Sequence, residues 1–368
     1  MTGPVVVDIA GRQLGEHDRS RLRHARAGMV ILFARNFESS PQLAALTAEI
    51  RALRAPPLLI AVDHEGGRVQ RFRAPPFTRI PAMSLLGGLW DRDVLLACRT
   101  AVSTGYVMAC ELRAHGVDLS FAPVLDLDWG RSSVIGDRAL HGDARVVALL
   151  AAQLAHGMAL AGMACCGKHF PGHGWAAADS HVATPVDDRS LAQIVGGDAA
   201  PYRWLGIALG GVMPAHVVYP QVDEKPAGFS SRWIKGVLRR QLRFTGAVFS
   251  DDLSMAGARV AGDIVARGQA ALDAGCDFVL ACNDSRAADD LLSGLRWRRT
   301  AAFERRLARI APRGAARTMD ELLRDPARFR ARVAELRRDW VYNLGRSGEA
   351  GAQAVAAMAA EIAAGAEI

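Results

Sequence analysis

The stretch between residues 168 and 181, KHFPGHGWAAADSH, concentrates residue types that can do chemistry: a lysine, three histidines and an aspartate. Histidines this close together could bind a metal ion, transfer protons or belong to a polar loop without chemistry. His169 and His173 have the four-residue spacing of zinc ligands on a helix, but Pro171 and two nearby glycines disfavour a continuous helix. Because an HExxH glutamate is also missing, we expect no metal and no cofactor here.

The end of the same stretch suits acid–base chemistry better. Asp179 and His181 are two residues apart, so in an extended segment their side chains point to the same side. The carboxylate could then hold one imidazole nitrogen, which fixes the tautomer and raises the basicity of the ring. A D-x-H pair is common by chance, but this one lies on a glycine-rich loop after a predicted strand, where it could close over a ligand.

A second stretch, VFSDDLSM at 248–255, places carboxylates at the end of an apolar run. Asp252 or Ser254 could cap the following helix, which leaves Asp251 for chemistry. A carboxylate opposite an acid–base group is what retaining glycoside hydrolysis needs. The carboxylate attacks the anomeric carbon, while the other group protonates the leaving oxygen and later activates water.

Two further stretches could bind the polar substituents of a sugar. In AVDHEGGRVQRF, Asp63 ends an apolar run and is followed by two glycines, Arg68 and Arg71. In VIGDRALHGD, Arg138 could bind a polar or anionic group. An ordinary salt bridge within a loop is the alternative for each stretch.

These stretches must be positioned by a common framework, and the apolar runs of the chain predict one. Continuous runs rich in Val, Ile, Leu and Phe alternate with helical patterns, as in strands that are covered on both faces. They span residues 5–11, 28–36, 57–65, 117–128, 162–170, 206–217, 246–253 and 275–284. The pattern predicts an α/β fold, a single TIM (β/α)8-type barrel. A doubly wound open sheet is the alternative, but no GxGxxG follows an early strand.

Polar residues follow most of the predicted strands. In a barrel the carboxyl ends of all strands surround one mouth, so these residues would converge on one site. Contact with solvent at strand ends explains any one of them, but explains less well so many Asp, Lys and His residues. They are Asn36, Asp63, Asp126, Lys168, His169, His216, Asp251 and Asn283.

Beyond about residue 285 the strand pattern stops, and residues 286–346 read as surface helices. We therefore predict a barrel domain at 1–300 and a C-terminal helical extension with an Ala-rich tail at 301–368. No signal peptide and no membrane-spanning run is found, which predicts a cytoplasmic protein without a membrane partner. The six cysteines lie in apolar runs without CxxC spacing, which is typical of small buried side chains.

The net charge of +7 raises the question of nucleic-acid binding. The basic residues are scattered, and the densest group, at 296–346, alternates with leucines and glutamates at helical spacing. Solvated helix faces have this pattern, so no nucleic-acid partner is expected.

Together, KHFPGHG…DSH, DHEGGRVQR, IGDRALHGD and FSDDLSM, in this order and spacing, resemble the family-three glycoside hydrolases. The resemblance covers residues 5 to about 300 and points to the bacterial β-N-acetylglucosaminidases of peptidoglycan recycling. The chain departs from the family at His64, where glutamine is common, and at 175–178, which begins with a bulky Trp175.

The resemblance implies a hydrolase that acts without a metal through a retaining exo-β-N-acetylglucosaminidase mechanism. We also expect the protein to be a monomer. Its implied substrate is a muropeptide, GlcNAc–1,6-anhydro-MurNAc with or without peptide. This would link the protein to cell-wall biogenesis and degradation, cell shape, the cell cycle and cell division. By resemblance, Asp251 is the nucleophile, His181 the acid/base and Asp179 the residue that orients His181, and the sugar-binding residues are Asp63, Arg71, Arg138, Lys168 and His169.

Three other functions stay open. A phosphorylase could use the same barrel, because a histidine acid/base repels phosphate less than a carboxylate does. A β-glucosidase is disfavoured by the Asp–His pair. A catalytically silent sugar-binding protein would need no nucleophile.

Overall fold

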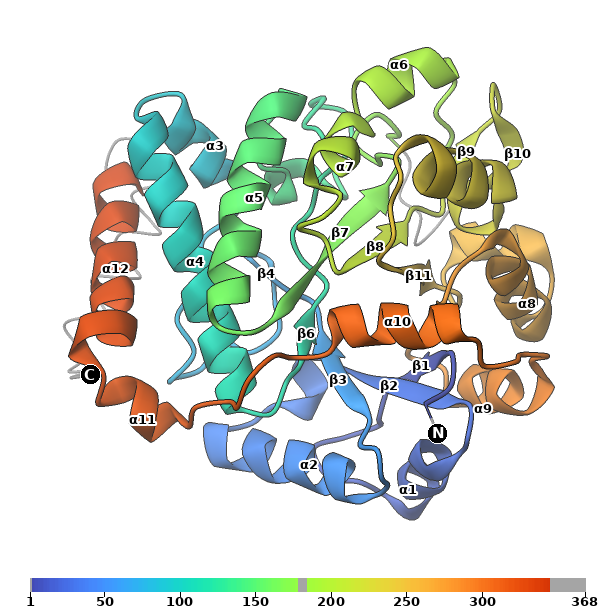
Figure 1. The fold of residues 1–368 in the computed structure, drawn as a ribbon, viewed down its shortest axis with the longest axis horizontal. Helices are drawn as coiled ribbons and strands as arrows, with labels where there is room; N and C mark the ends of the chain where they lie inside the picture. The colour runs from blue at the N-terminus through green and yellow to red at the C-terminus, as the bar shows by residue number, and fades with distance from the viewer. Residues whose placement is uncertain (1, 178–183, 345–368) are drawn as a thin grey trace.

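The computed structural model describes residues 2–177 and 184–344, and its centre is a closed barrel of eight parallel strands (Figure 1). Each strand falls on one of the eight apolar runs, which confirms the α/β barrel. Around the barrel the order is β1 (Val5–Val7), β12 (Phe278–Ala281), β11 (Ala247–Asp252), β8 (Gly211–Pro214), β7 (Ala164–Phe170), β6 (Leu119–Ser120), β3 (Leu59–Val62) and β2 (Ala27–Leu32). Two small antiparallel pairs, β4 (His64–Gly66) with β5 (Val69–Gln70) and β9 (Val218–Tyr219) with β10 (Asp223–Pro226), lie outside it.

The strands of the barrel are buried on both faces, as the continuous apolar runs predict. Along β2, Met29 and Ile31 belong to the cluster inside the barrel, whereas Val30 and Leu32 belong to the cluster between barrel and helices. This alternation follows from the two-residue period of a strand. It explains why the runs lack the polar–apolar alternation of a strand with one wet face.

Helices surround the barrel, and most of the longer ones begin at an N-cap whose side chain accepts a backbone N–H. Ser39, Asp93, Asp143, Asp263 and Asp284 cap in this way. The helices are α1 (Glu16–Arg23), α2 (Ser40–Ala52), α3 (Ser84–Trp90), α4 (Val94–Ala114), α5 (Ala144–Leu160), α6 (Leu191–Gly196), α7 (Ala200–Leu205), η4 (Arg232–Gln241), α8 (Ile264–Ala274) and α9 (Ser285–Gly294). Among the described helices, none combines the length and apolar character that crossing a bilayer requires.

Three more helices follow, namely α10 (Ala301–Ile310), α11 (Met319–Leu323) and α12 (Ala331–Leu344). Most residues of α10 are exposed or partly exposed, as expected of a surface helix, but its Phe303 and Ile310 side chains are buried. Its Phe303 is 3% exposed, belongs to the interior cluster and packs on Phe278, the first residue of β12, with ring centroids 5.0 Å apart. Therefore α10 closes the barrel at the amino ends of the strands. The division of the chain at residue 300 stays a proposal, and residues 345–368 lie outside the described part.

The fold also buries a carboxyl group that nothing in the active-site cavity uses. Glu111 of α4 is 1% exposed and accepts the Thr78 backbone N–H at 2.9 Å and the Thr78 hydroxyl at 2.6 Å. Burial raises the pKa of Glu111 to about 8. A neutral glutamic acid thus links α4 to the segment before α3.

Glu111→Gln is expected to flatten the pH dependence of stability. In the unfolded chain Glu111 releases its proton near pH 4.5, whereas the folded protein keeps it up to about pH 8. Its stabilisation is therefore complete at low pH and lost as pH rises between these values, by about 1.4 kcal/mol per pH unit. Urea unfolding from pH 5 to 8 measures this, with Glu224→Gln on the exposed part of β10 as control. Parallel curves for wild type and Glu111→Gln would refute the assignment.

Candidate active site

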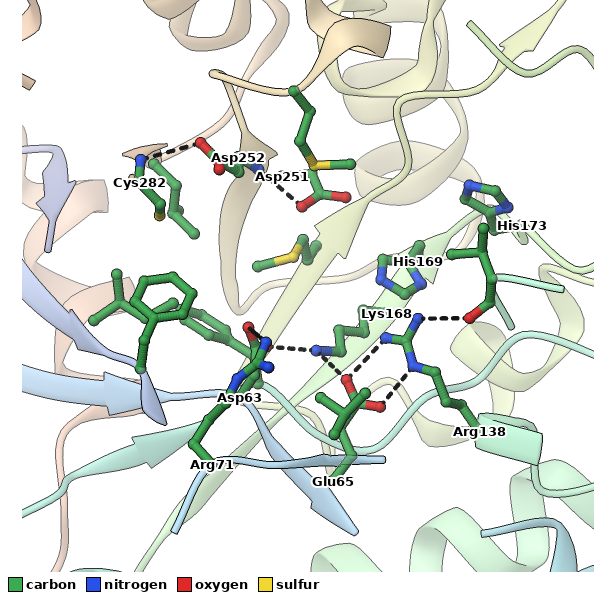
Figure 2. Close-up of a pocket in the computed structure, with 18 of the residues that line it drawn as sticks. Asp63, Glu65, Arg71, Arg138, Lys168, His169, His173, Asp251, Asp252 and Cys282 are labelled. Carbon is green, nitrogen blue, oxygen red and sulfur yellow. Dashed lines mark hydrogen bonds and ion pairs between the residues drawn. The ribbon is translucent and has the colours of Figure 1, made fainter. Parts of the chain in front are cut away.

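A cavity of about 490 Å³ opens at the carboxyl ends of the strands. Six of the eight residues predicted from the sequence line it: Asp63, Arg71, Arg138, Lys168, His169 and Asp251 (Figure 2). The other two, Asp179 and His181, lie outside the described residues. Residues up to 188 positions apart therefore meet because the barrel brings its strand ends together, as from Asp63 to Asp251.

Lys168 lies at the centre of a buried charge network. It projects from β7, its side chain is 3% exposed, and its Nζ lies 2.7 Å from Asp63 Oδ1 and 2.5 Å from Glu65 Oε1. Burial alone would lower the pKa of Lys168, but the two carboxylates raise it above its ordinary value. The ammonium group is therefore charged inside the cavity wall, where it holds Asp63 in place for a ligand.

Glu65 joins this network to Arg138. The Arg138 Nε and Nη2 atoms donate to Glu65 Oε2 and Oε1 at 2.8 and 2.9 Å, a bidentate pair. Burial alone would raise the pKa of Glu65, but the charges of Lys168 and Arg138 lower it below its usual range. Arg71 lies on the open side, with Nη2 3.6 Å from Asp63 Oδ2. Figure 2 shows these groups side by side in one wall of the cavity.

Sequence reasoning missed Glu65, although a signal was present. Glu65 is two residues after Asp63, so in extended backbone the two side chains share a side. In this stretch, chemistry is predicted only for Asp63 and the two arginines that follow the glycines, so Glu65 has no predicted role.

His169 is oriented by a buried aspartate. Asp126 is 0% exposed, and its Oδ2 lies 2.7 Å from His169 Nδ1. Asp126 Oδ1 also accepts the His173 backbone N–H at 2.7 Å. The Asp126 carboxylate thus fixes the orientation of the His169 ring and the position of the His173 backbone. Asp126 contacts Nδ1 of His169 and not Nε2.

The two adjacent carboxylates of β11 have different surroundings. Asp251 lines the cavity, and its Oδ1 accepts the backbone N–H of Asp252 at 2.8 Å. Burial alone would raise the pKa of Asp251, but His216, His169, that N–H and Lys168 together lower it below its ordinary value. Asp251 is therefore an ionised carboxylate at neutral pH.

Asp252 instead holds the backbone together. It accepts hydrogen bonds from the Ser254 hydroxyl at 2.7 Å, from the Ser254 N–H at 3.0 Å and from the Cys282 N–H at 3.1 Å. Burial raises the pKa of Asp252 to about 6. Both carboxylate oxygens of Asp252 are therefore occupied by hydrogen bonds to the residues that follow β11 and β12. This favours Asp251 as the reactive group.

The remaining strand-end residues have different positions. Asn283 lines the cavity. Asn36 is fully buried and donates to the carbonyls of Ile9 and Gly11, while His216 contacts the Asp252 carbonyl at 3.1 Å. Convergence on the cavity thus holds for most of the predicted strand ends, while Asn36 supports a neighbouring loop.

The inner end of the cavity is apolar. Ile31, Phe121, Met213 and Leu280 line it and also belong to the cluster inside the barrel. The cavity is therefore closed toward the barrel interior. In the described part of the chain, no group of three or more His, Cys, Asp or Glu side chains could hold a metal ion. All six cysteines are free thiols, and five of them are buried.

A closed barrel whose mouth holds an ionised carboxylate beside a network of charged side chains is the architecture of a (β/α)8 enzyme of the glycoside hydrolase type. The match to the Glycosyl hydrolase family 3 N terminal domain extends over residues 5–312. The chain belongs to glycosyl hydrolase family 3, and its activity is that of a β-N-acetylhexosaminidase.

Individual relatives support this assignment. The chain is 61% identical to the "Beta-hexosaminidase" of Bordetella avium over 324 residues, 88% of this chain and 92% of that protein. It is 61% identical to the "Beta-hexosaminidase" of Aromatoleum aromaticum, with 84% and 86% covered. NagZ from Neisseria gonorrhoeae in complex with N-trifluoroacetyl-D-glucosamine superimposes with a TM-score of 0.86 at 47% identity, with 91% of this chain and 97% of that chain covered.

Proposed function

We propose that this β-N-acetylglucosaminidase is a retaining exo-enzyme that removes terminal GlcNAc from GlcNAc–1,6-anhydro-MurNAc, with or without peptide. The reaction would serve peptidoglycan recycling in the cytoplasm and would need no metal. The observation that carries the proposal is the environment of Asp251, a partly buried but ionised carboxylate that lines a cavity of about 490 Å³.

In the first step, Asp251 attacks the anomeric carbon and forms a glycosyl ester, while His181 donates its proton to the glycosidic oxygen of the leaving group. Asp179 holds the imidazole for this transfer. In the second step, His181 takes a proton from water, which attacks the same carbon and releases Asp251. Two inversions retain the β configuration.

The charged wall of the cavity would bind the sugar. Asp63, fixed by Lys168, accepts hydrogen bonds from ring hydroxyls, and Arg71 and Arg138 lie beside it. Lys168 and His169 would contact the sugar oxygens beside the cleaved bond. Because the inner end is closed by apolar side chains, a saccharide can enter only by its terminal residue, which supports exo action.

Product analysis tests the proposal. GlcNAc–1,6-anhydro-MurNAc is incubated with and without inorganic phosphate, and the products are followed by NMR. We expect β-GlcNAc as the first-formed product at a rate that phosphate does not change. GlcNAc-1-phosphate as the only product would identify a phosphorylase instead. Faster cleavage of β-glucosides than of β-N-acetylglucosaminides, or binding without turnover, would also overturn the proposal.

A further inference from the structure

A second cluster of charged and aromatic side chains lies beside the cavity, and the proposed mechanism does not use it. Asp187 and Asp198 are both 0% exposed, and Arg189 joins them. The Arg189 Nη2 and Nε atoms donate to Asp187 at 2.6 and 2.9 Å, and Nη1 donates to Asp198 Oδ2 at 2.7 Å. The Trp129 Nε1–H donates to Asp198 Oδ1 at 2.9 Å, so the cluster extends to the loop after β6.

Trp175 packs on this cluster. Its ring makes an edge-to-face contact with Trp129, with centroids 5.2 Å apart. Two guanidinium groups lie over the Trp175 ring, that of Arg189 at 4.5 Å and that of Arg131 at 4.2 Å. The attraction between each guanidinium charge and the face of the ring stabilises this position of Trp175. Trp175 is therefore held by three side chains.

The contact between Trp175 and Arg189 joins two parts of the chain that flank residues 178–183. Before these residues, the Gly172 carbonyl accepts the Tyr219 hydroxyl at 2.7 Å. A Cβ at Gly174 would lie 1.9 Å from the Leu127 carbonyl, so the backbone there packs directly on the loop after β6. After them, the Asp187 N–H donates to the Val218 carbonyl at 2.9 Å. Both ends are thus fixed to the barrel and to each other.

We propose that Trp175, held by Arg131 and Arg189, is a positioning residue that fixes the point from which the segment with Asp179 and His181 extends. The inference rests on the proposed function, in which His181 protonates the leaving group. His181 is six residues after Trp175 and eight before Arg189 in the sequence, and the contact between Trp175 and Arg189 brings together the described ends of this short stretch.

The effect on the reaction depends on the leaving group. A poor leaving group such as a sugar needs protonation in the transition state, whereas dinitrophenolate leaves without it. Trp175→Ala is expected to lower kcat/KM for the disaccharide about tenfold or more, and for 2,4-dinitrophenyl β-GlcNAc by less than about threefold. Trp175→Phe, which keeps an aromatic ring for both guanidinium groups, is expected to restore most of the loss.

Reference variants separate this inference from the proposed function. Trp204→Ala removes a 53% exposed tryptophan of α7 and is expected to change neither rate. His181→Ala is expected to show the same selectivity with a larger loss. If His181→Ala lacks this selectivity, the proposed acid is wrong. If His181→Ala shows this selectivity, but Trp175→Ala slows both substrates equally or slows neither of them, the positioning role is wrong.

Arg131→Gln provides a second test that does not remove a half-buried ring. Arg131 is exposed, so its loss leaves the packing of the cluster intact. A selective loss on the disaccharide supports the positioning role even if Trp175→Ala does not fold. Unchanged rates on both substrates would contradict it.

Discussion

Asp251→Asn is expected to lower kcat for β-N-acetylglucosaminides by about 10⁴-fold or more, while the protein still folds and binds the sugar. The amide has the shape of the carboxylate but cannot attack the anomeric carbon. Its oxygen can still accept the Asp252 N–H, so the local backbone is kept. Turnover of a chromogenic substrate measures the loss.

The adjacent carboxylate offers a matched control. In Asp252→Asn the oxygen still accepts the N–H groups of Ser254 and Cys282. The new amide donates to the Ser254 hydroxyl, which then donates to the Cys282 carbonyl, a contact it already makes at 2.9 Å. We therefore expect Asp252→Asn to retain most activity. A fluorinated GlcNAc analogue should label Asp251, and a label on Asp252 would show that the wrong carboxylate was chosen.

Glu65→Gln is expected to lower the free energy of unfolding by about 3–5 kcal/mol. The Glu65 side chain is 2% exposed and is the bidentate partner of Arg138 as well as a partner of Lys168. Without this carboxylate, Lys168 and Arg138 lose the group that contacts both of them, and their positive charges repel each other inside the cavity wall. Urea unfolding measures the loss, and weaker binding of GlcNAc should accompany it because Lys168 and Arg138 lose their fixed positions.

Two comparisons sharpen this test. The same change in the exposed pair Arg68–Asp137, Asp137→Asn, is expected to cost about 0–1 kcal/mol, because both side chains are about half exposed. Adding Lys168→Met to Glu65→Gln removes the excess positive charge, so the double variant should be less destabilised than the sum of the single variants. Additive losses would show that the network is not electrostatically coupled.

The barrel could be predicted from the sequence because each buried parallel strand corresponds to a continuous apolar run that ends in a polar residue. The runs located all eight strands, although β6 is reduced to Leu119–Ser120, with only a bridge from Val124 to Lys168 beyond it. The closing role of α10 could not be predicted. Its burial depends on the amino ends of distant strands, and its arginines resemble those of a solvated helix.

Site residues could be predicted where their place at a strand end is enough to bring them to the cavity. They could not be predicted where their role depends on contacts with residues distant in the sequence. Asp63, Lys168 and Asp251 follow apolar runs, so topology alone brings them to the cavity. The burial of Glu65 depends on Arg138, 73 residues away, which no local pattern reveals. For the same reason, Trp175 looked like a bulky departure in a loop, and its contact with Arg189 emerged only from the packing.

The position of α10 has a consequence for how the chain folds during synthesis. The first strand, β1, pairs with β12 on one side, and the floor of the barrel is completed by Phe303 and Ile310. Until residue 281 has left the ribosome, β1 is paired with β2 alone, and until residue 310 has followed, the interior phenylalanines stay open to water. Nearly the whole enzyme must therefore be synthesised before its core can close. Until then the incomplete chain exposes apolar surface of the kind that chaperones bind.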